Sequence, residues 1–263
     1  MTEFYCNNVI LITERVVFLN VRLKSHINLL ISRYPKLIAC QDSIIAAYEM
    51  LENCYKSDYK LLIAGNGGSA ADSEHIAGEL MKRFKNPRPV DALFAERLIS
   101  IDPKRGPVLA QNLERSLMAI PLVAHEALST AYINDVDGYG VFAQQLLGYG
   151  RAGDVFLGIS TSGNSQNIMN AVVVAKALGI KVIGLTGADG GELARIADVA
   201  VKTPETETYM IQELHLPIYH CWCLMLEDRF FGEDSTTENC HNGWRLGEAS
   251  KKRWGLKCED LEL

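Results

Sequence analysis

The sequence predicts an α/β fold in which a parallel sheet lies between two layers of helices. Short apolar runs, each able to form a strand buried on both faces, alternate along the chain with segments of helical period. Strands that alternate with helices in this way form a three-layer sandwich. Hydrophobic residues make up 48% of the 263 residues, which is enough for the core that such a fold needs.

Two helices are predicted before the first strand. Apolar residues recur at spacings of three and four across residues 17–56, and Pro35 separates the two halves. Residues 59–64 then form a short apolar strand. It ends at the glycine-rich turn Gly65–Ser69, and a helix follows to about Phe84.

The middle of the chain is less regular. Residues 85–116 contain four prolines and are predicted to form an irregular connection with a helix near its end. Residues 118–124 are the next candidate strand. A helix, a loop at 134–140 and a second helix through Leu147 follow.

From residue 153 onward the alternation is clear. The predicted elements are a strand at 153–160, a turn at 160–165, a helix at 166–178, a strand at 180–187, a short helix at 190–197, a strand at 198–203 and a long helix at 207–230. The expected organisation is therefore N-terminal helices at 1–58, which also serve an oligomer interface, a core at 59–230, and a polar, charged tail or docking segment at 231–263.

Charge and cysteine content narrow the function classes. The net charge of -6 argues against a general nucleic-acid or anionic-membrane surface. The seven cysteines are scattered and none has C-x-x-C spacing, which favours a reducing compartment. The N-terminus has neither a signal-peptide layout nor an uninterrupted apolar run of ~18 residues. We therefore expect a cytoplasmic protein without nucleic-acid or membrane partners.

Two turns at strand ends are candidate anion sites. The first contains Asn66, Gly67 and Ser69, and the glycines allow the backbone to approach a ligand closely. The second carries four hydroxyls, on Ser160, Thr161, Ser162 and Ser165. Each turn precedes a helix, whose N-terminus favours an anion. The simpler interpretations are a tight turn for the first and helix capping for the second. Neither turn matches a Walker loop or G-x-G-x-x-G, which argues against nucleoside triphosphates and dinucleotides.

Proton-transfer groups lie on two predicted helices. His75 and Glu79 are four residues apart, so they share a helix face, and Gln212 and His220 lie on one side of the last helix. Each of these could be a structural polar group. Together they could also bind a divalent metal, and imidazole with carboxylate suits zinc. The other histidines are expected to be structural or on the surface: His26, His125, His215 and His241.

Five segments together resemble the sugar isomerase (SIS) domain, and specifically the phosphoheptose isomerase family. They are GNGGSAADSEHIAGEL, ND at 134–135, GDVFLGISTSGNSQNI, LTGADGGEL and IQELHLPIYH. The resemblance covers about residues 40–230. It implies a five-stranded parallel sheet between helices, and a homotetramer with its sites between subunits.

The resemblance also implies roles for particular residues. The family's sugar-phosphate loop maps onto Ser160, Thr161, Ser162 and Ser165, with Asn66, Gly67 and Ser69 from the first turn. Its catalytic pair maps onto Glu79 and His220. A zinc ion of the family maps onto His75, Glu79, Gln212 and His220. Further substrate contacts map onto Arg83, Asn134, Asp135 and Gln212.

Three features depart from the family pattern. Tyr209 replaces an acidic residue just before the IQE motif, the 85–116 segment is longer than in compact members, and the tail after 231 has no counterpart. In addition, Pro217 removes a helix hydrogen bond between Gln212 and His220, so we expect a kink there.

The expected activity is aldose–ketose isomerisation of sedoheptulose 7-phosphate to D-glycero-D-manno-heptose 7-phosphate through an enediol. Glu79 is the expected base and His220 the acid or ring-opening group, with zinc as the electrophile. Whether Glu79 is a zinc ligand or a free base stays open. One alternative is a non-catalytic SIS protein that regulates through protein contacts. The other is an isomerase of a different sugar phosphate.

Overall fold

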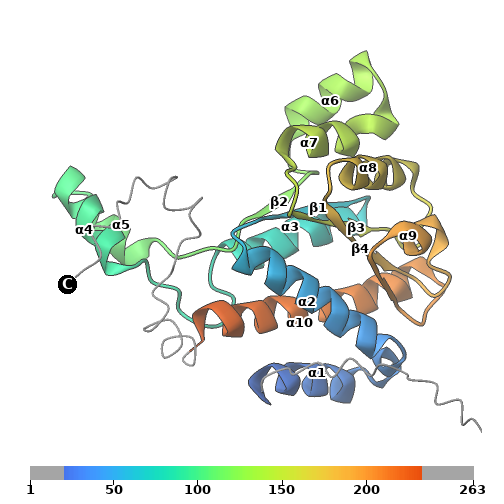
Figure 1. The fold of residues 1–263 in the computed structure, drawn as a ribbon, viewed down its shortest axis with the longest axis horizontal. Helices are drawn as coiled ribbons and strands as arrows, with labels where there is room; N and C mark the ends of the chain where they lie inside the picture. Colours follow the sequence, from blue (N-terminus) through green and yellow to red (C-terminus); the bar gives the residue numbers. More distant parts are fainter. Residues whose placement is uncertain (1–20, 233–263) are drawn as a thin grey trace, which may run out of the picture.

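A parallel sheet forms the centre of the protein (Figure 1). The computed structural model describes residues 21–232, and within that range the sheet has five strands in the order β2-β1-β3-β4-β5. The strands are β1 (Leu61–Gly65), β2 (Ala119–Pro121), β3 (Val155–Ile159), β4 (Lys181–Thr186) and β5 (Val199–Lys202). All neighbouring pairs are parallel, which confirms the predicted fold class.

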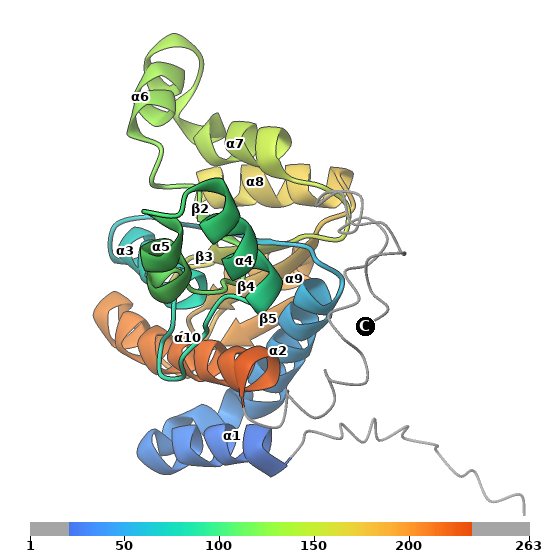
Figure 2. The ribbon, with the colours of Figure 1, turned by 90° about the vertical axis from the view of Figure 1, so that its left-hand side faces the viewer.

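Helices cover both faces of the sheet (Figure 2). The helices on one face are α2 (Gln41–Lys56), α3 (Gly68–Met81) and α10 (Thr208–Phe231), and those on the other are α7 (Val141–Tyr149), α8 (Gln166–Ala177) and α9 (Gly191–Ile196). Alternate strand residues serve the two layers: Leu61 and Ile63 point to the first, and Leu62 and Ala64 to the second. This explains why the strands appear as unbroken apolar runs in the sequence.

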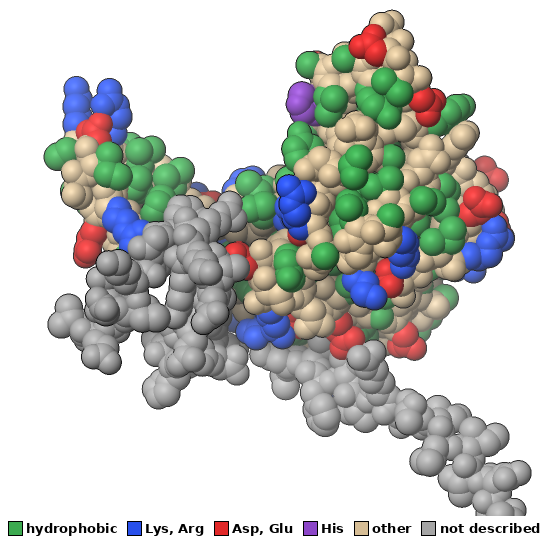
Figure 3. Space-filling view, turned by 45° about the horizontal axis from the view of Figure 1, so that its top comes forward, with side chains coloured by type: hydrophobic (Ala, Val, Ile, Leu, Met, Phe, Trp, Pro, Cys, Tyr) green, Lys and Arg blue, Asp and Glu red, His purple; other side chains and the backbone are tan. Residues whose placement is uncertain are grey.

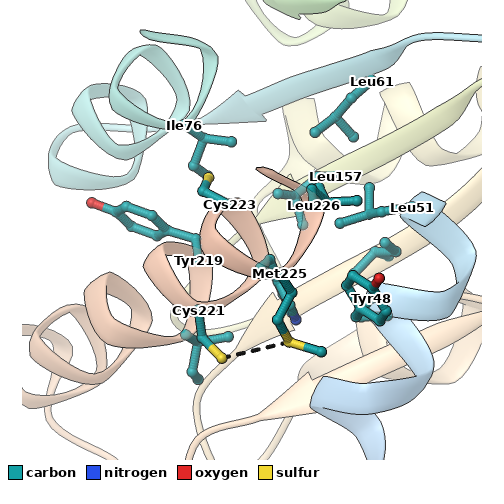
Figure 4. Close-up of a cluster of buried hydrophobic side chains, with 14 of the residues drawn as sticks. Tyr48, Leu51, Leu61, Ile76, Leu157, Tyr219, Cys221, Cys223, Met225 and Leu226 are labelled. Atoms are coloured by element: carbon teal, nitrogen blue, oxygen red, sulfur yellow. Dashed lines mark hydrogen bonds between the residues drawn. The ribbon is translucent and has the colours of Figure 1, made fainter. Parts of the chain in front are cut away.

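The larger core lies between α10, α2, α3 and the sheet (Figure 4). Trp222 is buried there, and its indole N–H donates to the carbonyl of Ile44 at 2.9 Å. The thiols of Cys221 and Cys223 are also buried. Burial raises the pKa of Cys221 to about 12, so this thiol is an inert packing group.

Helix α1 (Val21–Arg33) packs outside this layer. It is joined to α2 by a 3₁₀ turn, η1 (Pro35–Cys40), that begins at the predicted break. His26 of α1 contacts Asp228 of α10 at 2.5 Å and fixes α1 against the last helix. The first residues of the predicted helix (17–20) and the predicted tail from 233 onward lie outside the described residues.

The segment 85–116 contains more helix than the sequence predicts. It forms α4 (Ala92–Ile101) and α5 (Gly106–Asn112), which pack on each other as a helical hairpin; we call residues 92–112 the arm. The Asp91 carboxylate caps α4 by accepting from the N–H of Phe94 at 2.8 Å, and Pro107 lies in the first turn of α5. No residue of α4 is buried, and the arm stands away from the sheet (Figure 1). In the space-filling view the arm forms a separate lobe (Figure 3).

Two smaller boundaries also differ from the prediction. Helix α3 ends at Met81 rather than near Phe84, and α6 (Glu126–Asp135) extends into the predicted loop, which continues as a 3₁₀ turn, η2 (Gly138–Gly140). Helix α10 continues through Pro217 as a single helix. None of the helices among residues 21–232 combines the length and the apolar content that a membrane crossing requires.

Candidate active site

The two predicted turns meet at the centre of the sheet. Strands β1 and β3 are neighbours, although the chain leaves β1 toward β2 and returns on the other side. Such a reversal opens a crevice at the carboxyl ends of the strands, where α/β proteins bind ligands. The side chains of Asn66 and Asn167 join the two turns with reciprocal amide hydrogen bonds of 2.9 and 2.8 Å. The two turns therefore lie side by side at the switch point, and we call this place the crevice.

Glycine is required where the first turn bends into α3. Gly67 has φ of 56°, in the left-handed region that favours glycine. A Cβ on Gly65 would lie 2.4 Å from the carbonyl oxygen of Ser69, so the chain doubles back too tightly for a side chain. Gly68 faces Gln212, whose amide nitrogen would be 2.8 Å from a Cβ at that position. Gln212 therefore lies with the glycine turn.

The hydroxyls of the second turn are arranged around Gly163. Its φ is 67°, and a Cβ there would lie 2.0 Å from the carbonyl oxygen of Gly190. Ser165 is the N-cap residue of α8, yet its side chain makes no capping bond. Its hydroxyl instead contacts that of Ser160 at 3.0 Å. The Ser165 hydroxyl therefore does not cap α8, and it lies with that of Ser160 at a helix N-terminus that suits an anion, while the Ser162 hydroxyl accepts from the backbone N–H of Asn164 at 3.2 Å.

A second cluster lies farther along α3, where it packs against α10. The Nε2 atom of His75 is 3.3 Å from Oε1 of Glu79 and 3.4 Å from Nε2 of His220. The ring of Phe84 lies against His220, with ring centroids 5.3 Å apart. Burial, and then the neighbouring His75, lower the pKa of His220, so its neutral form is favoured. The two predicted catalytic residues, Glu79 and His220, are thus brought to the same place.

The donor atoms of this cluster suit zinc. Two ligands of a tetrahedral zinc ion, each about 2.0–2.2 Å from the metal, are about 3.4 Å apart. The two distances from His75 Nε2 match that separation. Across residues 21–232 there is nevertheless no group of three His, Cys, Asp or Glu side chains already arranged around one metal position. The residue types and the two distances from His75 fit, and closure around a metal would need side-chain movements.

Gln212 lies apart from the other predicted zinc ligands. Helices α3 and α10 run side by side in the same direction, because Gln212 faces Gly68 while His220 contacts His75. Gly68 and His75 are separated by about 10 Å along the helix axis. Gln212 thus lies beside the anion crevice, which suits its other predicted role in substrate binding.

The side chains of the remaining predicted contacts have other partners within the chain. The guanidinium of Arg83 contacts the Glu114 carboxylate at 3.2 Å. Asn134 donates to Asp135 at 2.7 Å, and both residues are exposed at the end of α6. Figure 1 shows α6 projecting on the far side of α7 and α8, away from α3. Within one chain, these residues are therefore not part of the crevice.

The other described histidines have structural roles, as expected. His215 is fully buried, with its Nε2 3.3 Å from the carbonyl of Thr186, and burial lowers its pKa to about 4. The ring of His125 caps α6 by accepting from Leu128, and His26 holds Asp228 as described above. His241 lies outside the described residues.

Sequence reasoning missed several members of the site. Asn167 bridges the turns, Phe84 lies against His220, and the hydroxyl of Tyr219 contacts both Asp72 and His75. The spacing of three between Asp72 and His75 could have indicated that they share a helix face. Tyr219 carries no such signal, because its role depends on how α10 packs against α3.

Two joined turns at the switch point and a carboxylate–imidazole cluster on the adjoining helices are the kinds of groups that an enzyme acting on a phosphorylated substrate needs. Residues 35–187 match the model of the SIS domain. The chain belongs to the SIS-domain family, and within it to the phosphoheptose isomerases.

Relatives and solved structures support that membership. A phosphoheptose isomerase from Sulfurimonas denitrificans is 42% identical over 68% of this chain and 78% of its own. One from Aneurinibacillus thermoaerophilus is 36% identical over 81% of this chain and 96% of its own. The structure of a phosphoheptose isomerase from Neisseria gonorrhoeae aligns with a TM-score of 0.60 at 32% identity, covering 79% of this chain and 97% of that one. One from Francisella tularensis has a TM-score of 0.62 at 28% identity over the same shares.

Proposed function

We propose that the protein isomerises sedoheptulose 7-phosphate to D-glycero-D-manno-heptose 7-phosphate. The observation that carries this proposal is the convergence of Glu79 and His220, from two separate helices, on His75. An aldose–ketose isomerase needs a base to move a proton between C1 and C2, and an acid to serve the neighbouring oxygen. Membership of the phosphoheptose isomerases supplies the substrate class.

In this mechanism the crevice holds the phosphate and Glu79 moves the proton. The hydroxyls of Ser160, Thr161, Ser162 and Ser165, with the backbone N–H groups of the two turns, bind the phosphate oxygens. Glu79 takes the proton from C1 of the ketose and returns it to C2 of the enediol, while His220 exchanges a proton with the sugar oxygen.

We propose that His75, Glu79 and His220 hold a zinc ion, which would polarise the substrate oxygens when bound. The two oxygens of Glu79 have different neighbours, since Oε1 faces His75 and Oε2 lies 3.1 Å from the ammonium of Lys82. One oxygen can therefore serve the metal while the other accepts the proton. Gln212 would then bind sugar rather than complete the metal ligands. Its place beside Gly68 supports that role.

We also propose that the complete site forms between subunits of a homo-oligomer, with a tetramer as the expected form. Ser69 and Glu79 are ten residues apart on one helix, which places them about 15 Å apart along its axis. C2 and the phosphorus of an extended heptose 7-phosphate are at most about 10 Å apart, given carbon–carbon bonds of about 1.5 Å. The crevice of one copy would therefore work with the Glu79 cluster of another. Asn134 and Asp135, exposed on α6, would be available to the same neighbour.

The free, buried thiols of Cys40, Cys54, Cys221 and Cys223 support a reducing, cytoplasmic location for this enzyme.

Kinetics of two glutamine variants test the base. Glu79→Gln keeps size but loses basicity, so we expect kcat on sedoheptulose 7-phosphate to fall about 10²- to 10⁴-fold with a small change in KM. Glu74→Gln, on an exposed position of the same helix, is the control and should keep the parental rate. Parental turnover by Glu79→Gln would contradict the mechanism. A parent that turns over no ketose phosphate in a panel would favour the regulatory alternative.

Three binding measurements test the remaining parts. Sedoheptulose 7-phosphate should raise Tm, whereas sedoheptulose without its phosphate should not, and equal protection would exclude the phosphate crevice. A chelator should abolish turnover, and added zinc should restore it. The variant His220→Asn should bind less zinc than the parent. Full activity without metal would refute the zinc site. Light scattering should report an oligomer, and a 29.1 kDa monomer at micromolar concentration would refute the shared site.

A further inference from the structure

A tyrosine hydroxyl lies between a carboxylate and the cluster histidine. Tyr219, on α10, is 1% exposed, and its hydroxyl is 3.0 Å from Oδ1 of Asp72 and 3.1 Å from Nδ1 of His75. Figure 4 shows its ring leaving the hydrophobic cluster with the hydroxyl directed away from the core. The contacts with Asp72 and His75 connect α10 to α3 beside Glu79.

The number of available protons determines the direction of these hydrogen bonds. An ionised carboxylate can only accept, and a tyrosine hydroxyl has one proton to donate. Tyr219 therefore donates to Asp72 and offers a lone pair to His75, so Nδ1 of His75 must carry the ring proton. The reverse direction would require a protonated Asp72, which its ordinary pKa disfavours at neutral pH even though burial raises it.

We infer that Tyr219, oriented by Asp72, is a positioning residue that fixes His75 in the Nδ1–H tautomer and directs the lone pair of Nε2 to the proposed zinc position beside Glu79 and His220. This inference rests on the proposed zinc-dependent function. Nε2 is the atom that lies 3.3 Å from Glu79 and 3.4 Å from His220, so the fixed tautomer directs the ligand lone pair to that place. Metal-binding histidines are commonly held by such a hydrogen bond on the second nitrogen, and losing it typically weakens metal affinity 10- to 100-fold.

If Tyr219 served only to pack, Tyr219→Phe would behave like the parent. Its ring lies edge-on to His75 and His220, with centroids 5.5 and 5.1 Å away, and Phe would keep these contacts. Tyr219→Phe removes only the hydroxyl. Tyr48→Phe is a matched control, because Tyr48 is also fully buried and its hydroxyl has no hydrogen-bond partner among the described residues.

The experiment measures zinc affinity, tautomer and kinetics in the full-length protein. In Tyr219→Phe we expect zinc to bind 10- to 100-fold more weakly in competition with a chromophoric chelator. In ¹⁵N NMR of the metal-free protein, His75 should carry its proton on Nδ1 in the parent and lose that preference in the variant; a His75→Gln spectrum assigns the signals. At subsaturating zinc, kcat should fall while KM for sedoheptulose 7-phosphate stays within about twofold. Tyr48→Phe should match the parent in all three measurements.

The outcomes separate this inference from the proposed function. Parental zinc affinity in Tyr219→Phe, or an Nε2–H tautomer in the parent, would overturn the positioning role whether or not the protein is an isomerase. An inactive parent with the expected tautomer and zinc response would instead contradict the proposed function and leave the positioning role in place.

Discussion

Replacing Arg88 with methionine should strongly destabilise the protein, because it breaks a buried ion pair at the end of α3. Arg88 and Glu227 are 0% and 1% exposed, and their side chains contact each other at 2.9 and 3.0 Å. Glu227 also accepts from the backbone N–H groups of Phe84 and Lys85, at 2.7 and 2.8 Å. Arg88 in turn donates to the last carbonyls of α3, including that of Leu80 at 2.8 Å.

The expected loss of stability depends on which hydrogen bonds remain after Arg88 is replaced. Breaking a buried ion pair costs about 3–5 kcal/mol, since the remaining charge is left uncompensated. Glu227 retains its backbone donors in Arg88→Met, which places the expected loss near the lower limit, about 3 kcal/mol. Arg88 also donates a hydrogen bond of 3.2 Å to the backbone carbonyl of Glu79, so turnover should fall as well.

Denaturant unfolding at a fixed protein concentration measures this loss. The matched control is Arg105→Met, which breaks an ion pair with Asp102 on the exposed arm and should cost much less stability than Arg88→Met, because solvent screens exposed ion pairs. Equal losses in the two variants would refute the reasoning. A variant of Arg88 too unstable to purify would agree with it.

Three further predictions concern the crevice and its support. Gly163→Ala would place a Cβ 2.0 Å from a carbonyl oxygen at a positive φ, so the rise in Tm caused by sedoheptulose 7-phosphate should become smaller. Gly148→Ala, at an open helical position, is the control and should leave that rise unchanged. Equal rises in the two variants would contradict the close approach at Gly163. Asn167→Asp places a negative charge beside the proposed phosphate site and should raise KM at least tenfold without loss of stability, and an unchanged KM would refute that location. Burial lowers the pKa of His215 to about 4, so the unfolded chain binds its proton first as pH falls. The free energy of unfolding should thus decrease by about 2 kcal/mol from pH 7 to pH 5, and His215→Leu should remove that part of the decrease.

The parts of this molecule that depend on local pattern were predictable from sequence. Runs such as 153–160 form strands because both of their faces are buried, and the meeting of the two turns follows from parallel strands ending at one edge. Helix α4 was missed because the prolines around it suggested an irregular segment. Pro107 lies in the first turn of α5, and Asp91 caps α4, a capping signal that the prediction did not use.

Contacts between distant helices could not be predicted in this way. The distance of Gln212 from His75, and the contact of Tyr219 with Asp72, depend on the register between α3 and α10. That register results from packing across the whole core, and no local spacing encodes it. Three of the predicted metal ligands, His75, Glu79 and His220, lie together, while the position of Gln212 needed the fold.

The two ends of the arm lie side by side, so the arm could be replaced by another segment. Pro89 and Glu114 form an antiparallel bridge, and the N–H of Arg115 donates to the carbonyl of Arg88 at 2.7 Å. Of the described apolar residues in 92–112, none belongs to either buried cluster. Because the two ends already meet, a linker of different length would change the closure entropy only slightly. The arm is thus a natural attachment point for a fluorophore or a foreign domain, a short distance along the chain from Glu79.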